Sequence, residues 1–159
     1  MDLREELLSL VDLFAAEGIE YAVCGGIALA IHGYPRLTRD IDVLIRPEDV
    51  ERAVTAVASL GFVLDAGELP FESGTPRARK VRRISKTSGP EGLTLDLLIV
   101  SPVLESAWGS RGVFRWEGRD LRAVSREGLA EMKRLAGRDQ DIVDAKKLET
   151  AGDDTDRSE

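Results

Sequence analysis

Cysteine, histidine and long apolar runs are scarce in this sequence of 159 residues. Its only cysteine, Cys24, has no partner for an internal disulfide, so a reducing cytoplasm is the natural compartment. Its only histidine, His32, is interpreted as a packing or solvated residue. No apolar run approaches the roughly 20 residues that a membrane span needs, and the acidic start Met1–Glu6 does not resemble a signal peptide. We therefore expect a cytoplasmic protein with no membrane partner.

Composition and charge indicate one globular domain. Hydrophobic residues make up 43% and charged residues 32% of the chain, as in ordinary soluble proteins. We expect a single domain over residues 1–150, followed by a disordered acidic tail at 151–159. The net charge of −7 disfavours a nucleic-acid footprint over the whole surface, although it leaves room for a local basic patch.

The hydrophobic pattern alternates between strand and helix periods, which is typical of an α/β domain. Capping residues, glycines and prolines mark the boundaries of the elements. Residues 65–75, with two glycines and a proline, are expected to be a loop. We expect helices at residues 2–17, 27–32, 47–60, 126–136 and 139–150, and strands at 21–24, 39–46, 62–64, 77–87, 93–100, 113–116 and 120–124.

Two short motifs follow each other near the N-terminus. The pair Gly25-Gly26 stands between a strand and a helix, where glycine lets the backbone approach a ligand and the helix start suits phosphate. Asp40 and Asp42 are two residues apart in a strand, so their carboxylates share a face about 6.5 Å apart along the backbone and suit Mg²⁺. A structural turn and a solvated strand face are the plainer interpretations of these motifs.

A third motif is the acid Asp96 within the apolar stretch Leu93–Val100. An unpaired buried carboxylate is unfavourable, so Asp96 needs hydrogen bonds, a salt bridge or a metal ion. Pairing with an arginine and binding of a metal both stay open. We expect Asp96 to lie on a strand adjacent to that of Asp40 and Asp42, and the three carboxylates to converge within reach of one ion.

The order of these three motifs resembles the nucleotidyltransferase superfamily, to which DNA polymerase beta belongs. The stretch from Tyr21 to Ile45 is similar to the small bacterial branch of that group. The segment from Met132 to Asp144 is similar to the Lys-x-x-Ala-x-Arg-x-x-Asp segment of AbiEii-like nucleotidyltransferases, many of which are toxins of toxin–antitoxin pairs. The resemblance covers about residues 21–148 and implies a nucleotidyltransferase fold, in which helices flank a mixed β-sheet.

For the nucleotide, the resemblance implies that Gly25 and Gly26 hold the β- and γ-phosphates of a nucleoside triphosphate, and that Lys133 lies near them. Arg39, beside the aspartates, is a further candidate for orienting phosphates. Many relatives have Ser or Thr directly after the glycine pair, whereas Ile27 has no side-chain hydrogen bond to offer.

For the metal, the resemblance implies two Mg²⁺ ions, for which Mn²⁺ can substitute. Asp40 and Asp42 would bind both ions, and Asp96 would share the second ion and help to deprotonate the acceptor hydroxyl. In-line displacement at the α-phosphate would then release pyrophosphate.

These expectations give a magnesium-dependent enzyme that moves a nucleoside monophosphate from a triphosphate to an acceptor. The acceptor is RNA or a protein if the chain is a toxin, or a small molecule such as an antibiotic. A non-enzymatic module of the same fold, which binds a nucleotide or a partner, is the alternative. Because the chain has little room for an acceptor-gripping domain, an antitoxin partner or a homodimer could complete the site.

A basic segment precedes Asp96. If it pairs as the neighbouring strand, alternate cations would line the cleft and bind a phosphate-bearing acceptor, while the others face solvent. An edge strand protected by its charges against aggregation is the alternative. The segment holds six cations: Arg77, Arg79, Lys80, Arg82, Arg83 and Lys86.

Overall fold

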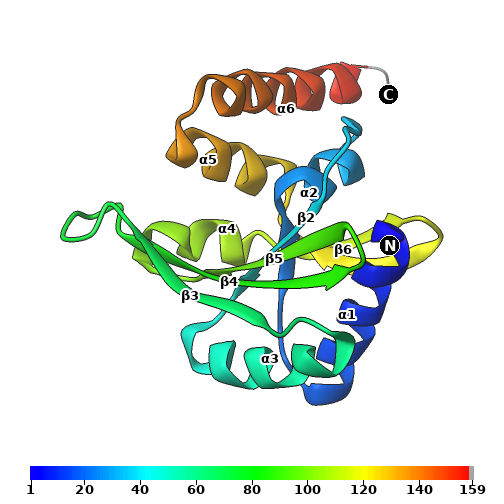
Figure 1. The fold of residues 1–159 in the computed structure, drawn as a ribbon. Coiled ribbons are helices and arrows are strands. Elements are labelled where there is room, and N and C mark those ends of the chain that lie inside the picture. Colours follow the sequence, from blue (N-terminus) through cyan, green and yellow to red (C-terminus); the bar gives the residue numbers. More distant parts are fainter. Residues whose placement is uncertain (158–159) are drawn as a thin grey trace.

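A mixed β-sheet lies at the centre of the protein, whose computed structural model describes the backbone of residues 1–157 and the side chains of residues 1–150. Within this part of the chain, seven strands form one sheet in the order β3-β4-β5-β2-β1-β7-β6 (Figure 1). The predicted α/β fold with a mixed sheet flanked by helices is therefore confirmed. The strands are β1 (Ala22–Cys24), β2 (Asp40–Ile45), β3 (Leu64–Phe71), β4 (Arg79–Ser88), β5 (Glu91–Ile99), β6 (Gly112–Trp116) and β7 (Arg119–Ala123).

Helices cover both faces of this sheet (Figure 1). Helices α1 and α3 pack on one face, and α2, α4, α5 and α6 lie on the other. Within the described residues, no helix is long and apolar enough to cross a membrane. The helices are α1 (Leu3–Glu17), α2 (Gly25–Ile31), α3 (Val50–Val57), α4 (Glu105–Gly109), α5 (Arg126–Ala136) and α6 (Asp139–Arg157), with 3₁₀ turns at Pro47–Asp49, Ala58–Leu60 and Pro102–Leu104.

Strand β2 shows how the sequence pattern separates the two faces. Ile41, Val43 and Ile45 are buried in the core under α1 and α3, as their period of two predicts. Leu44 points the other way, into the core beneath α2, α4 and α5. Asp42 shares the Leu44 side, so the acids of β2 lie on the face that α2 and α5 cover.

Capping residues set the helix ends as the sequence predicts. Asp2 accepts hydrogen bonds from the backbone amides of Arg4 and Glu5 at the start of α1. Gly18 ends that helix with a φ of +67°, in the left-handed region where glycine is favoured. Ser125 and Gly137 do the same for α5.

Helix α4 was not expected from the sequence, and among the boundaries that differ from the expected ones, those of β3, α2 and α6 differ as follows. Strand β3 occupies Leu64–Phe71, most of which was expected to be a loop, because β4 supplies the partner hydrogen bonds and a register shift between Asp65 and Gly67 absorbs the glycine. Helix α2 begins at Gly25 instead of residue 27. Helix α6 continues to Arg157, beyond the expected end at residue 150. The division into a domain and a disordered tail at 151–159 stays a prediction, and residues 158–159 lie outside the described residues.

Candidate active site

A cavity of about 410 Å³ lies over β2, β5 and β4, on the face of the sheet that carries α5. All three predicted acids, Asp40, Asp42 and Asp96, line it. The cavity is therefore charged around the aspartates and partly apolar elsewhere. The other lining residues are Phe71, Arg79, Lys80, Val81, Arg83, Leu98, Leu104, Ala136 and Arg138.

Strand register brings two of the acids together. β2 and β5 are parallel neighbours, and Asp42 stands directly opposite Asp96. Asp40 lies two residue pairs away along the same ladder, opposite Thr94. The expectation that Asp96 lies on the strand adjacent to the other two acids is confirmed, because the parallel ladder aligns residues that are 54 positions apart in the sequence.

Asp42 is the acid whose ionisation the site disturbs most. Burial raises its pKa to about 7, and the negative charges of Asp96 and Asp40 add to the shift. The positive charges of Lys133 and Arg83 oppose it without cancelling it. Near neutral pH, Asp42 is therefore held between its protonated and ionised forms, a state that a bound cation would resolve towards the carboxylate.

Asp96 instead has a cationic partner. Arg83 on β4 stands opposite it in the antiparallel β4–β5 ladder. The Arg83 guanidinium donates two hydrogen bonds, from Nε to Oδ1 at 2.8 Å and from Nη2 to Oδ2 at 3.1 Å. Of the two possibilities left open for Asp96, an arginine pair is therefore the one that the structure contains.

The three aspartates are suitable ligands for a divalent metal ion, although their side chains are not arranged around one. Three carboxylates offer the hard oxygen ligands that Mg²⁺ and Mn²⁺ prefer. Within the described residues, however, no three carboxylate, histidine or cysteine side chains stand close enough together to hold an ion. Arg83 contacts both oxygens of Asp96 in this arrangement, and the convergence of Asp40, Asp42 and Asp96 on one ion stays a prediction.

The glycine pair lies against the aspartate strand, not on the wall of the cavity. Gly25 has a φ of +64°, and a Cβ atom there would come within 2.1 Å of Asp42 Oδ2. A Cβ atom on Gly26 would meet the Thr38 side chain at 3.2 Å. Gly25 is therefore required for the position of the Asp42 carboxylate. Ile27 is buried in the core under α1, so its side chain points away from the site.

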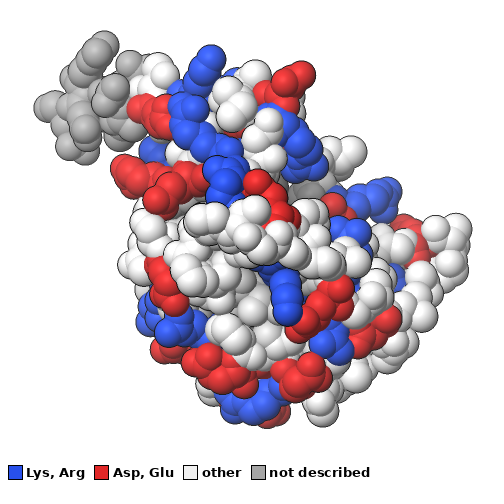
Figure 2. Space-filling model, turned by 90° about the vertical axis from the view of Figure 1, so that its left-hand side faces the viewer, with Lys and Arg blue, Asp and Glu red and all other residues white. Residues whose placement is uncertain are grey.

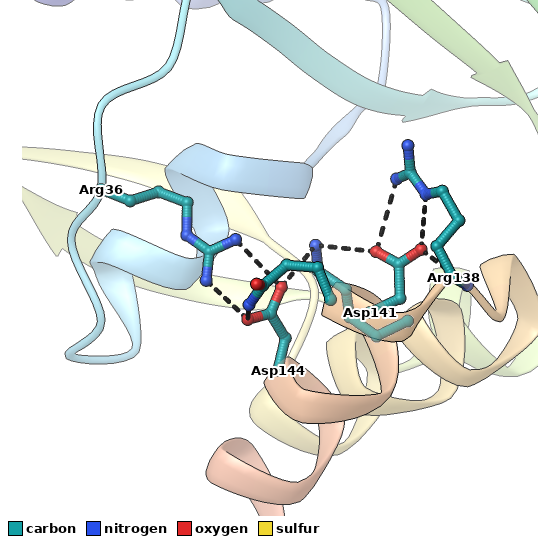
Figure 3. Close-up of polar contacts among 6 residues, drawn as sticks. Arg36, Arg138, Asp141 and Asp144 are labelled. Atoms are coloured by element: carbon teal, nitrogen blue, oxygen red, sulfur yellow. Dashed lines mark hydrogen bonds and ion pairs between the residues drawn. The ribbon is translucent and has the colours of Figure 1, made fainter.

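Lys133 of α5 lies in a cluster of charges with Asp141 and Asp144 of α6, which Figure 3 labels together with Arg36 and Arg138. Its Nζ is 3.2 Å from Asp144 Oδ2 and 3.5 Å from Asp141 Oδ1. Arg36, from the loop before β2, forms two hydrogen bonds with Asp144, and Arg138 pairs with Asp141 at 2.7 Å. Lys133 thus lies close enough to influence Asp42 but is directed towards the acids of α6. Its predicted role at the triphosphate is not tested by this geometry.

Arg39 is not in the aspartate cavity. It lines a separate cavity of about 200 Å³ with Leu37, Thr38 and residues near the N-terminus. Its backbone carbonyl accepts a hydrogen bond from the Thr94 amide. Arg39 directly precedes Asp40 in the chain, but its side chain lines a different cavity from the three acids. Its role in nucleotide binding stays a prediction.

The basic segment from Arg79 onwards forms β4 and pairs with β5, as expected, whereas Arg77 lies before the strand. It is not an edge strand, because β3 covers its other side, so the edge-protection interpretation is wrong. The cations directed away from the cavity do not simply face solvent: Arg82 pairs with Glu51 and Asp65, and Lys86 with Glu6.

Each of the six cations has a carboxylate within 4 Å, so the segment creates little unbalanced positive field. Basic and acidic side chains are likewise interspersed on the face drawn in Figure 2.

The sequence did not predict two of the contacts near the site, those of Arg83 with Asp96 and of Arg36 with Asp144. Arg83 was considered with Arg82 as a contact to the acceptor, and only the β4–β5 register pairs it with Asp96. Asp144 was quoted in a motif without a role, although it is fully buried and holds Arg36. A spacing of three residues between Asp141 and Asp144 was the one available signal that both face the same side of a helix.

Comparison with known families defines the class of protein. The family described as "Uncharacterised nucleotidyltransferase" matches residues 1–99, and the chain belongs to it. The matched range contains the glycine pair and all three aspartates, whereas Lys133 lies beyond it. The predicted superfamily and the prediction of a transferase enzyme are confirmed, while the AbiEii-like branch stays a prediction. No curated protein matches the chain.

Solved structures share the fold. A candidate nucleotidyltransferase from Thermotoga maritima has a TM-score of 0.62 at 16% identity, over 97% of this chain and 96% of that one. ANT(2″)-Ia, in complex with adenylyl-2″-tobramycin, has a TM-score of 0.56 at 16% identity, over 91% and 87%. The lincosamide antibiotic adenylyltransferase LnuA, with lincomycin bound, has a TM-score of 0.51 at 15% identity, over 91% and 95%.

Proposed function

We propose that this chain is a magnesium-dependent nucleotidyltransferase that moves a nucleoside monophosphate from a triphosphate to a small-molecule acceptor. The observation that carries the proposal is the pairing of Asp42 with Asp96 on parallel strands at one cavity, with Asp40 beside them. Membership of the nucleotidyltransferase family supports the reaction class.

Asp40, Asp42 and Asp96 are the residues that would hold the metal. When bound, Mg²⁺ supplies positive charge that stabilises the phosphate oxygens during displacement at the α-phosphorus. Asp42 must lose its proton for this role, and its pKa of about 7 allows that at physiological pH. Asp96 would accept the proton of the acceptor hydroxyl as the oxygen attacks.

Two groups beside the acids suit the phosphates. Gly25 leaves room for the Asp42 carboxylate, which lies where a side chain would start, and contact of the Gly25 backbone with a phosphate is part of this proposal. Arg138 lines the cavity with an 81% exposed side chain, so it can reach a phosphate without being uncovered first. Lys133 acts on the site through its positive charge, which lowers the pKa of Asp42 and so favours the carboxylate.

A small-molecule acceptor is favoured over RNA by the charges around the cavity. Every cation of β4 is paired with a carboxylate, whereas a phosphate backbone is bound by cations that are free to contact it. Two of the similar structures hold an antibiotic or an adenylylated antibiotic, which supports a small acceptor. A toxin acting on RNA or protein, an antitoxin partner, a homodimer and a cytoplasmic location stay predictions.

Nucleotide transfer can be measured with four α-labelled nucleoside triphosphates, Mg²⁺, and either a panel of hydroxyl-bearing small molecules or total RNA. We expect label on a small molecule with the wild-type protein and none with Asp42→Asn. The exposed variant Glu149→Gln is a matched control that should transfer normally. If only RNA becomes labelled, RNA is the acceptor and the small-molecule proposal is wrong.

The non-enzymatic alternative is tested by binding. We expect Mg²⁺ with a triphosphate to raise the melting temperature of the wild-type protein by mass action. A shift without transfer to any acceptor would favour a nucleotide-binding module, and no shift at millimolar ligand would contradict the proposed function.

A further inference from the structure

Arg83 occupies the oxygens that the proposed function assigns to a metal ion. Its guanidinium contacts both oxygens of Asp96, at 2.8 and 3.1 Å, in the two-pronged geometry of a strong charge-assisted hydrogen bond. Asp96 is 8% exposed, whereas the Arg83 side chain is 45% exposed. The acid is therefore fixed inside the protein, and its cationic partner lies at the mouth of the cavity.

The other two acids have no cation of their own. Within the described residues, neither Asp40 nor Asp42 forms a salt bridge. Both act on Arg83 instead: after the contacts with Asp96, their negative charges help to raise the pKa of the guanidinium. Arg83 is thus paired with Asp96 and also interacts with the charges of Asp40 and Asp42.

The backbone around Arg83 is held in place, but its side chain is not enclosed. β4 lies between β3 and β5, and Arg83 is bonded in register to Gly67 on one side and Asp96 on the other. A change of partner therefore requires rotation of the side chain only. The aspartate cavity is the space into which the half-exposed guanidinium can turn.

We propose that Arg83 and the metal ion compete for Asp96. The inference rests on the proposed function and adds a positioning residue to it. In the metal-free protein, Arg83 neutralises a buried carboxylate that would otherwise be unpaired. When the ion arrives with a triphosphate, the guanidinium leaves Asp96 and binds phosphate oxygens, which accept the same two-pronged contact. Metal and nucleotide therefore bind with positive coupling.

Binding of MnCl₂ without nucleotide, followed by electron paramagnetic resonance, tests the competition directly. We expect Arg83→Gln to bind Mn²⁺ about tenfold more tightly than the wild type, because the competing cation is gone. Arg82→Gln is the matched control: it is the adjacent residue, it pairs with Asp65 and Glu51, and it faces away from the cavity. Equal or weaker binding by Arg83→Gln would overturn the proposal.

Thermal unfolding separates competition from a merely structural role. Arg83→Gln leaves Asp96 buried without a partner, so we expect a lower melting temperature in the absence of metal. Mn²⁺ should then raise the melting temperature of this variant more than that of the wild type. A loss that Mn²⁺ does not restore means that Arg83 only supports the fold, and it overturns the exchange.

Coupling distinguishes failure of this inference from failure of the proposed function. In the wild type, a non-hydrolysable α,β-methylene triphosphate should increase Mn²⁺ affinity, and the increase should be smaller in Arg83→Gln. If the wild type binds Mn²⁺ with the analogue but the variant shows the same coupling, only the exchange is wrong. If the wild type binds no Mn²⁺ even with the analogue, both the metal site and the exchange are wrong.

Discussion

Two pairs of acids lie close together in this domain, Asp42 with Asp96 and Asp141 with Asp144, and the pKa of Asp42 is shifted in the opposite direction to those of Asp141 and Asp144. Burial raises the pKa of Asp42 to about 7, with help from Asp96 and Asp40. Burial also disfavours ionised Asp141 and Asp144, but hydrogen bonds and charges from Arg138, Arg36, Gln140 and Lys133 lower their pKa values below the ordinary range.

The difference lies in how many cations each pair receives. Asp141 and Asp144 share three cations, so their charges are satisfied within the protein (Figure 3). At the cavity, one cation, Arg83, pairs with Asp96, and Asp42 forms no salt bridge within the described residues. The charges of Asp141 and Asp144 are thus balanced by cations of the protein itself. The pair at the cavity, Asp42 and Asp96, has less positive charge beside it, and a ligand can supply the rest.

The largest effect should follow from breaking the completed pair. Asp144→Ala leaves Arg36, Lys133 and Gln140 without their shared acceptor, and we expect a loss of about 3 to 5 kcal/mol in the free energy of unfolding. Urea denaturation measures this loss. Glu149→Ala, in the same helix but with an exposed salt bridge to Arg134, should change stability by less than about 0.5 kcal/mol. Equal effects would contradict the contrast between buried and exposed pairs.

Removing the charge of Asp42 at the cavity should instead increase the free energy of unfolding. The pKa of Asp42 is about 7 in the folded protein against 3.8 for the unfolded group, so the folded state binds more protons in this window. Its contribution to stability therefore falls as pH rises from about 4 to 7. In metal-free buffer at pH 8, Asp42→Asn should be more stable than wild type by about 2 kcal/mol, with a ceiling of about 4.

Denaturation of Asp42→Asn across pH checks the cause of that gain. Near pH 4 the advantage should nearly vanish, because wild-type Asp42 is then neutral in the folded state. A variant that is less stable than wild type at pH 8 would show that the Asp42 carboxylate is satisfied after all.

Proton release gives a smaller and independent effect. Because the metal must displace a proton from Asp42 below its pKa of about 7, Mn²⁺ affinity should rise with pH and level off above that value. The slope below pH 7 should approach tenfold per pH unit. Calorimetry at several pH values measures it, and an affinity that does not change between about pH 5.5 and 8.5 would falsify the assignment of Asp42 as a ligand.

The smallest effect compares two glycines with similar backbone conformations. Gly18 has a φ of +67° and no atom within 4 Å of an added Cβ, whereas at Gly25, with a φ of +64°, the added atom would meet Asp42. Gly18→Ala should lose about 1 kcal/mol from left-handed strain. Gly25→Ala should lose about 1 kcal/mol more and should also weaken Mn²⁺ binding. Equal stability and unchanged Mn²⁺ affinity would remove Gly25 from the site.

Local signals in the sequence predicted much of this fold. Alternation of apolar and polar residues in β2 identified both its conformation and the face that carries Asp40 and Asp42. Asp2, Gly18, Ser125 and Gly137 marked helix ends because capping depends on residues within one turn. Most of β3 was not predicted, because its strand conformation depends on hydrogen bonds from β4. Its own residues, including Gly67 and Pro70, argue against a strand.

The sequence by itself determined the α/β class, the aspartate strand with its neighbouring glycine pair, and the lone acid in an apolar strand, since each of these depends on residues close together in the chain. Only the tertiary structure decided that Arg83 holds Asp96, that Lys133 faces Asp141 and Asp144, and that Arg39 lies outside the cavity. The physical reason is that ion pairing depends on distance in space. Strand register and helix packing choose which of the many charged side chains meet, and no local pattern in the sequence encodes that choice.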